Sequence, residues 1–258
     1  MALVVLYLQF KFRALMSLLL ISLCFFLIAV LYSTAGFGGG SSYIAILLFA
    51  NLPIIDLRWI ALICNIIVVS TSCWYFYKVD ILKPKKLFPL IILSIPLAFF
   101  GGTFQPETNS FKLVAAIALI GAAILMIIDY KRIEKKISNT TLSGIGGGIG
   151  LLSGFIGIGG GIFLSPVLHI VKWESAKVIS AAASYFILVN SIAGLIGQSL
   201  NSPQIDWQIC IILGLAVFVG GQIGNRLNIH ILSAKRIKLI TAILIAFVGF
   251  RILYMQIF

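Results

Sequence analysis

Two short glycine strings are the residues of this sequence best suited to do chemistry. The first is GFGGG at Gly36–Gly40 and the second is GIGGG at Gly157–Gly161. Glycine is costly inside a helix and adopts unusual φ and ψ angles, so each string is expected to interrupt a helix. A short helix that starts just after such a break offers free N–H groups and the positive end of its dipole. Two such helix starts facing each other would bind a small anion without any charged side chain.

The alternative is that these glycines only let helices pack closely, as small-xxx-small patterns do. Two matched strings, each followed by a half-length apolar run, favour a ligand site over packing alone. The spans that hold Asn65 and Asn190 resemble each other, WIALICNIIVVSTSCWYF against SYFILVNSIAGLIGQ, which places Asn65 against Asn190. Both add to this site, because a buried amide is costly and each half of the chain carries one. The candidate substrate-binding residues are Gly38, Gly39, Gly40, Ser41, Ser42, Asn65, Gly159, Gly160, Gly161, Ile162, Ser184, Tyr185, Asn190 and Gln222.

Other kinds of chemistry have little support in the sequence. All seven acidic residues fall at the ends of apolar runs or in loops, so no carboxylate proton relay at the membrane midplane is predicted. The four cysteines lie singly in apolar runs without CxxC spacing, which favours small buried hydrophobic roles over metal or redox chemistry. We therefore expect no catalytic residues, no metal and no cofactor, and a protein that is not an enzyme.

The elements that hold these residues are expected to be membrane helices. Of the 258 residues, 61% are hydrophobic and 10% are charged, with a mean hydropathy of +1.14. A soluble domain carries about 25% charged residues. Several apolar runs reach the length of about 20 residues that a helix needs to cross a bilayer. The alternating segments of a transmembrane β-barrel do not occur. The composition predicts an all-α, polytopic membrane protein.

The apolar runs follow one another in the same order twice. Each glycine string lies between a longer run and a run of about ten residues, which as a helix crosses only half a bilayer. This predicts a broken or re-entrant helix pair, and three full spans follow each pair. We expect two repeats, residues 1–130 and 131–258, within one membrane domain. The runs are 14–33, 41–50, 58–77, 87–104 and 111–129, then 142–156, 162–171, 177–199, 207–225 and 237–257.

Loop charges predict that the two repeats are inverted, as in many secondary transporters. The net charge of +12 is gathered in short loops, which indicates membrane topology rather than nucleic-acid binding. Strict inversion puts the N-terminus outside, with Lys11 and Arg13 on the unfavoured side. The alternative is that 14–33 spans fully and 41–50 alone is re-entrant. The basic loops predicted inside are 78–86, 131–136, 172–177 and 226–238, and the loops without Lys or Arg are 51–57, 104–110 and 199–206.

The sequence resembles the TauE/SafE family of sulfite exporters and related anion permeases over nearly its whole length. The resemblance rests on AGFGGGSSYIAIL, SGFIGIGGGIFLSPVL, SYFILVNSIAGLIG and DWQICIILGLAVFVGGQIGNRL. It implies a permease of the cell inner (plasma) membrane for sulfite, organosulfonates or similar small anions, with export described for members and import assigned to some. The first half departs from the second, with GGGSS in place of GGGIFLSP, so the site need not be symmetric.

The expectation from the sequence is a secondary transporter that exports a small oxyanion by alternating access. Its partners would be the anion and membrane lipid, without nucleic acid, and a homo-oligomer is open. The rival interpretations are an anion channel or an importer on the same architecture, and a membrane scaffold that transports nothing.

Overall fold

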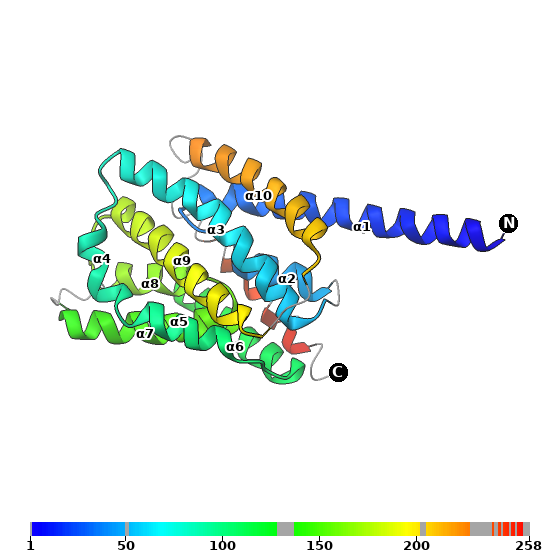
Figure 1. Cartoon of the computed structure of the whole chain (residues 1–258). Coiled ribbons are helices and arrows are strands. Elements are labelled where there is room, and N and C mark those ends of the chain that lie inside the picture. Colours follow the sequence, from blue (N-terminus) through cyan, green and yellow to red (C-terminus); the bar gives the residue numbers. More distant parts are fainter. Residues whose placement is uncertain are drawn as a thin grey trace.

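The computed structural model describes residues 2–49, 52–127, 137–201 and 205–227, and near the C-terminus residues 239, 242–243, 245–247, 249–250 and 252–254. In this part of the chain all regular structure is helical and there is no strand, which confirms the all-α prediction. The basic loop 131–136 and about half of the predicted span 237–257 lie outside the described residues. The helices up to Leu227 are α1 (Ala2–Ser33), α2 (Gly40–Phe49), α3 (Ile54–Lys78), α4 (Pro84–Ile91), α5 (Ser94–Thr103), α6 (Thr108–Ile127), α7 (Asn139–Ile156), α8 (Gly161–Ile170), α9 (Ala176–Ser199) and α10 (Trp207–Leu227) (Figure 1).

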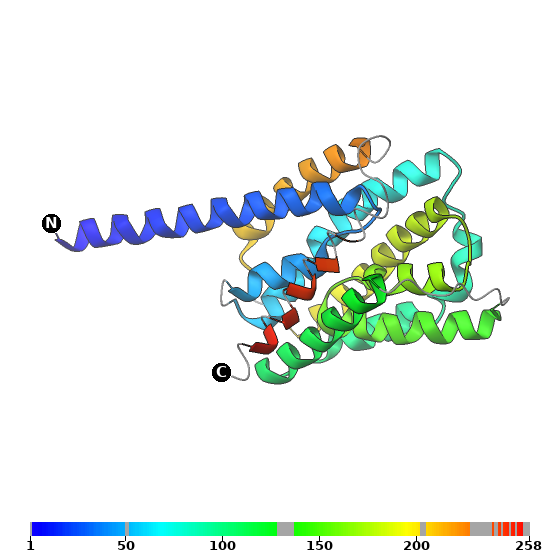
Figure 2. The ribbon, with the colours of Figure 1, turned by 180° about the vertical axis from the view of Figure 1, so that it is seen from behind.

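The helices have the lengths that a multi-pass membrane protein needs. Among the described residues, α3, α6, α9, α10 and the Met16–Ser33 part of α1 are long and apolar enough to cross a membrane, and α4 with α5 makes a sixth candidate. Helix α1 begins at Ala2, well before the predicted start at residue 14, and its N-terminal part extends beyond the other helices (Figures 1 and 2). A full-length α1 agrees with the alternative in which 14–33 spans and the short helix alone is re-entrant.

The run 87–104 is not the single span that its hydropathy predicts. It is divided into α4 and α5, which meet at an angle of 50°. Pro96 explains the position of the break, because a proline lacks an N–H group and its ring clashes with the carbonyl group four residues earlier, here that of Ile92. The bend follows there, between Ile91 and Ser94.

The two glycine strings form matching turns, as predicted. The first glycine turn, residues 34–39, joins α1 to α2, and the second, residues 157–160, joins α7 to α8. Gly39 and Gly160 immediately precede the short helices and have φ of +92° and +81°, a region that other residues adopt only at a cost. Both α2 and α8 have ten residues and begin on the glycine that follows. The sequence alignment of the two strings therefore holds at the level of the backbone.

Helices from the two halves of the chain pack in exchanged pairs. Helix α1 packs on α10, α7 packs on α5, and α3 packs on α9 in the middle, while α2 lies on α3 and α8 lies on α9. Figures 1 and 2 show α1 beside α10 and α7 beside α5 from opposite sides. The first helix of each half therefore packs against a helix of the other half.

Close packing is the role of many glycines outside the turns. A Cβ atom at Gly146, Gly150 or Gly154 of α7 would overlap a backbone carbonyl oxygen of α4 or α5. Gly220 and Gly224 of α10 approach the backbone of α1 in the same way. Spacings of four residues put such glycines on one helix face, which allows the helices to approach closely. The packing explanation thus holds for these five helical glycines, and the turn glycines need another one.

Candidate anion site

The side chain of Asn65 lies between the two glycine turns. Asn65 is on α3 and is fully buried. A Cβ atom at Gly38 or Gly40 would overlap its amide, so the amide lies directly against the start of α2. A Cβ atom at Gly159 would be 3.0 Å from Asn65 Nδ2, so the same amide also touches the second turn. One side chain therefore contacts both glycine turns.

Two neighbouring buried groups, the amide of Asn65 and the hydroxyl group of Ser191, have no hydrogen-bond partner. Neither Oδ1 nor Nδ2 of Asn65 is bonded, and the hydroxyl group of Ser191 on α9 is also buried without a partner. A Cβ atom at Gly159 would lie 3.0 Å from Ser191 Oγ as well as from Asn65 Nδ2. More than nine in ten buried polar groups in proteins are bonded, and an unpaired one costs about 1–3 kcal/mol. The unpaired groups make the region between the turns the candidate binding site.

The two short helices begin beside this pair. The carbonyl group of Gly39 accepts bonds from the third and fourth residues of α2, and the carbonyl group of Gly160 accepts the equivalent bonds in α8. The N–H groups of the first two residues of each helix lie outside these ladders, as at any helix start. Together with the positive dipole ends, they suit an anion. These residues are Gly40, Ser41, Gly161 and Ile162.

The other predicted hydroxyl groups lie around the turns. Ser184 of α9 donates to the carbonyl oxygen of Gly36 at 2.6 Å and so ties α9 to the first glycine turn. Ser42 bonds the hydroxyl group of Tyr32 at 2.8 Å. Tyr185 and Gln222 are only partly buried. Tyr185 packs against a separate apolar cluster that includes Phe76 and Phe186, so it lies away from the Asn65 amide.

The predicted equivalence of Asn65 and Asn190 is wrong. Gly159 and Gly161 contact Ile187 where Gly38 and Gly40 contact Asn65, so Ile187 is the positional counterpart. The amide of Asn190 is occupied elsewhere, because Nδ2 donates to Phe186 O at 2.8 Å and Oδ1 accepts from Ser94 Oγ at 2.9 Å. The sequence comparison slipped by three residues, nearly one helical turn.

Four further buried polar side chains place the pair in a longer series. On α3, Arg58, Asn65 and Ser72 are fully buried and recur every seven residues, and on α9 Ser184, Ser191 and Gln198 do the same. A spacing of seven residues keeps side chains on one helix face. We call these six residues the polar track. Arg58 was not predicted as part of this series because it stands at the end of an apolar run, and the spacing of seven residues was the signal that could have found it.

The two sides of the polar track run in opposite directions. At one end, Arg58 of α3 donates to the carbonyl group of Gly102, and a Cβ atom at Gly102 would lie 3.2 Å from the backbone nitrogen of Gln198 on α9. In the middle, Asn65 and Ser191 share the second glycine turn. Residue numbers therefore increase along α3 in the direction in which they decrease along α9. The two helices are antiparallel, as Figure 1 shows.

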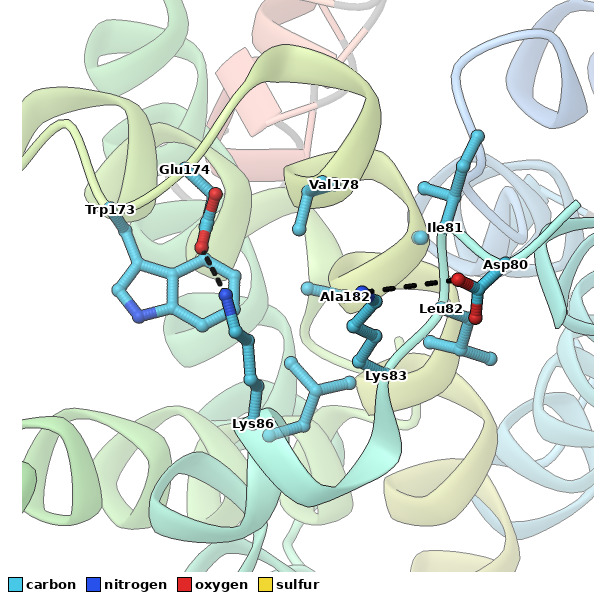
Figure 3. A pocket seen from close by; sticks show the side chains of 11 residues that line it. Asp80, Ile81, Leu82, Lys83, Lys86, Trp173, Glu174, Val178 and Ala182 are labelled. Atoms are coloured by element: carbon cyan, nitrogen blue, oxygen red, sulfur yellow. Dashed lines mark hydrogen bonds and ion pairs between the residues drawn. The ribbon is translucent and has the colours of Figure 1, made fainter.

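A cavity of about 240 Å³ opens beside the Ser184 end of the polar track. It is lined by Ala181 and Ala182, one turn before Ser184, and by residues of the basic loop predicted inside. Figure 3 shows Lys86 reaching Glu174, which also lines the cavity, with Nζ and Oε1 2.7 Å apart. The pair joins α4 to the segment before α9, and more than half of the Lys86 side chain stays exposed. The cavity thus lies beside the Ser184 end of the track, on the side of the basic loop 78–86.

Comparison with known proteins agrees with this architecture. The profile of the sulfite exporter TauE/SafE family matches residues 21–252. The chain belongs to the TauE/SafE family. This family is one of membrane transporters, and the fold is that of a multi-pass protein of the plasma membrane.

Relatives of this TauE/SafE protein carry matching names. A probable membrane transporter protein of Sinorhizobium fredii is 29% identical over 91% of this chain and 97% of its own length. A probable membrane transporter protein of Methanocaldococcus jannaschii is 26% identical over 94% of this chain and 97% of its own length. A third, of Haemophilus influenzae, is 25% identical over 81% of this chain and 81% of its own length. No solved structure matches the chain.

Proposed function

We propose that this TauE/SafE protein exports a small oxyanion, sulfite or an organosulfonate, and that the anion binds between the glycine turns. The observation that carries the proposal is the unpartnered pair, Asn65 and Ser191, buried beside the starts of two helices. An oxyanion has several acceptor sites and would bond the Asn65 amide, the Ser191 hydroxyl and helix N–H groups together. The described acidic residues lie in loops or first turns, where they would not repel it.

We propose alternating access between two inverted repeats, residues 1–130 and 131–258. The antiparallel packing of α3 on α9 supports inversion, because these helices hold the same place in each half. The exchanged contacts of α1 with α10 and of α7 with α5 support a two-fold relation between the halves. Movement of one repeat against the other would open the polar track first to the cavity beside Lys86 and then to the opposite side.

The roles of the candidate residues follow from their positions. Asn65, Ser191 and the N–H groups at the helix starts would contact the anion. Ser184 and Ser42 would hold the turns in place through the bonds described above. Asn190 would lock α9 to α5, and Tyr185 and Gln222 would line the path rather than the site.

The test is selective stabilisation followed by counterflow. The detergent-purified protein is heated with sulfite, sulfate, thiosulfate, an organosulfonate or chloride. A ligand at about 100 times its Kd raises the free energy of unfolding by about 2.7 kcal/mol. We expect one sulfur oxyanion to raise the Tm selectively and to show saturable counterflow in proteoliposomes. Stabilisation by cations or neutral solutes, without any by anions, would refute the proposed site.

The same assays separate the rival functions. Flux that does not saturate and shows no counterflow would indicate an anion channel. Saturable uptake that runs only inward under physiological gradients would indicate an importer. Absence of flux with every anion in the panel would indicate a scaffold.

A further inference from the structure

We infer that Arg58 and Gln198 form a second anion-binding station at one end of the polar track. The inference rests on the proposed function and adds a site to it. Arg58 lies seven residues before Asn65 on α3, which is about 10 Å along a helix at 1.5 Å per residue. The two stations are therefore separate, and an anion would occupy them in turn.

Arg58 is a buried cation without an anionic partner in the part of the chain that the structure describes. The described ion pairs are those of Lys83 and Lys86, and none involves Arg58. Its Nη1 donates to Phe104 O at 2.9 Å, and its Nη2 donates to Gly154 O at 2.9 Å. Its Nε–H group is buried and unbonded. Burying an uncompensated charge is strongly unfavourable, so a counter-ion at this place would stabilise the protein.

Gln198 brings a second unsatisfied group to the same place. It is fully buried, and neither atom of its amide has a partner. It follows Gly194 by one turn, and Gly194 packs directly on Gly102. The carbonyl group of Gly102 in turn accepts a bond from Arg58 Nη2 at 3.4 Å. The guanidinium group and the glutamine are thus both held around Gly102, one from α3 and the other from α9.

A purely structural role accounts for only part of this arrangement. Two of the three guanidinium nitrogens cap carbonyl groups at the C-terminal ends of α5 and α7, where a positive charge is favourable, Nη1 at Phe104 and Nη2 at Gly154. That role uses neither the Nε–H group of Arg58 nor the amide of Gln198. An oxyanion would accept from both, and a singly protonated one, such as hydrogen sulfite, would also donate its hydroxyl group to Gln198 Oε1.

The charge of this station also gives it a function in selectivity. Arg58 stands at the start of α3, beside loops that contain no Lys or Arg and are predicted to face outside. A fixed positive charge at that end would draw the anion from the Asn65 station and keep cations from entering. The station would therefore complete the route that begins at the cavity beside Lys86.

The test uses Gln198, because substitution of Arg58 would remove the caps of two helices. Gln198→Glu puts a carboxylate beside Arg58 and replaces the anion. We expect the variant to be folded, with a Tm at least that of the wild type, and to lose saturable anion uptake by about tenfold or more. Gln198→Met removes one donor and should weaken uptake by roughly two- to fivefold, the effect of one lost hydrogen bond. The control is Gln208→Glu, the same change at an exposed position on α10, which should leave uptake unchanged.

The outcomes separate this station from the site between the turns. Wild-type KM and rate in Gln198→Glu, with saturable uptake by the wild type, would overturn the station and leave the proposed function intact. Equal losses in Gln198→Glu and Gln208→Glu would also overturn it, because the effect would then be one of overall charge. No saturable anion uptake by the wild type would overturn both.

Discussion

Replacing Asn65 by leucine should make the protein more stable and inactive at once. Leucine has nearly the shape of asparagine and no polar atoms to leave unpaired. In the ligand-free protein the buried amide of Asn65 bonds nothing, and an unpaired buried group costs about 1–3 kcal/mol. Asn65→Leu should therefore raise the free energy of unfolding by about 1–3 kcal/mol, or the Tm by about 2–4 °C for each kcal/mol.

The matched control is Asn190→Leu, where the same substitution should have the opposite sign. The Asn190 amide makes two hydrogen bonds, and its loss leaves the hydroxyl group of Ser94 buried and unpaired. We expect a decrease of about 1–3 kcal/mol. Thermal unfolding in detergent, followed by tryptophan fluorescence, measures both variants without ligand and with sulfite.

Two results would refute this reasoning. If Asn65→Leu loses stability as Asn190→Leu does, the Asn65 amide has a structural partner and is not waiting for a ligand. If Asn65→Leu keeps its stabilisation by sulfite and its uptake, the anion binds elsewhere. A ligand-binding role for the Asn65 amide predicts a variant that is more stable than the wild type, is not stabilised by sulfite and takes up no anion.

Three further predictions follow from single contacts. Gly160→Ala should lower the free energy of unfolding by about 1–3 kcal/mol and abolish stabilisation by the anion, because φ is +81° at this position. Its control is Gly148→Ala, in open space on α7, which should raise the free energy of unfolding by about 0.5–1 kcal/mol in the same thermal unfolding experiment. Asn225→Leu should lower stability by about 1–3 kcal/mol, since its amide bonds two hydroxyl groups of α3, and unchanged melting would contradict this. Lys86→Met should change stability by less than about 1 kcal/mol because its pair with Glu174 is partly exposed. Initial uptake by this variant should be slower than that of the wild type at low ionic strength, and the difference should disappear in high salt, which screens the charge of Lys86.

Much of the fold could be predicted from the sequence because hydropathy and glycine act locally. The starts of α2 and α8 follow from the two glycine strings, and most span boundaries agree within a few residues. The bend between α4 and α5 was missed because an average over an apolar run hides the effect of Pro96, although the proline itself was visible.

The site could be predicted only in part, because partners across the bundle are not local. The glycine turns and Asn65 could be identified, yet the pairing of Asn65 with Asn190 depended on an alignment in which a shift of three residues costs little. Arg58 was overlooked because a charge at the end of a span usually reaches water along its stem. Its bonds to carbonyl groups at the ends of α5 and α7 show that it is buried instead, and these partners are 43 or more residues away in the sequence.

The exchanged packing of α1 and α10 has a consequence for biosynthesis. Helix α1 leaves the ribosome before α10, the helix that covers it, and residues 34–206 separate the two. At about 5–20 residues per second, roughly 10–40 s pass between the synthesis of the two. During that time the face of α1 that later receives Gly220 and Gly224 has no permanent neighbour. The insertion machinery or lipid must hold this nascent helix, and a chain that stalls before α10 would leave it open to proteolysis.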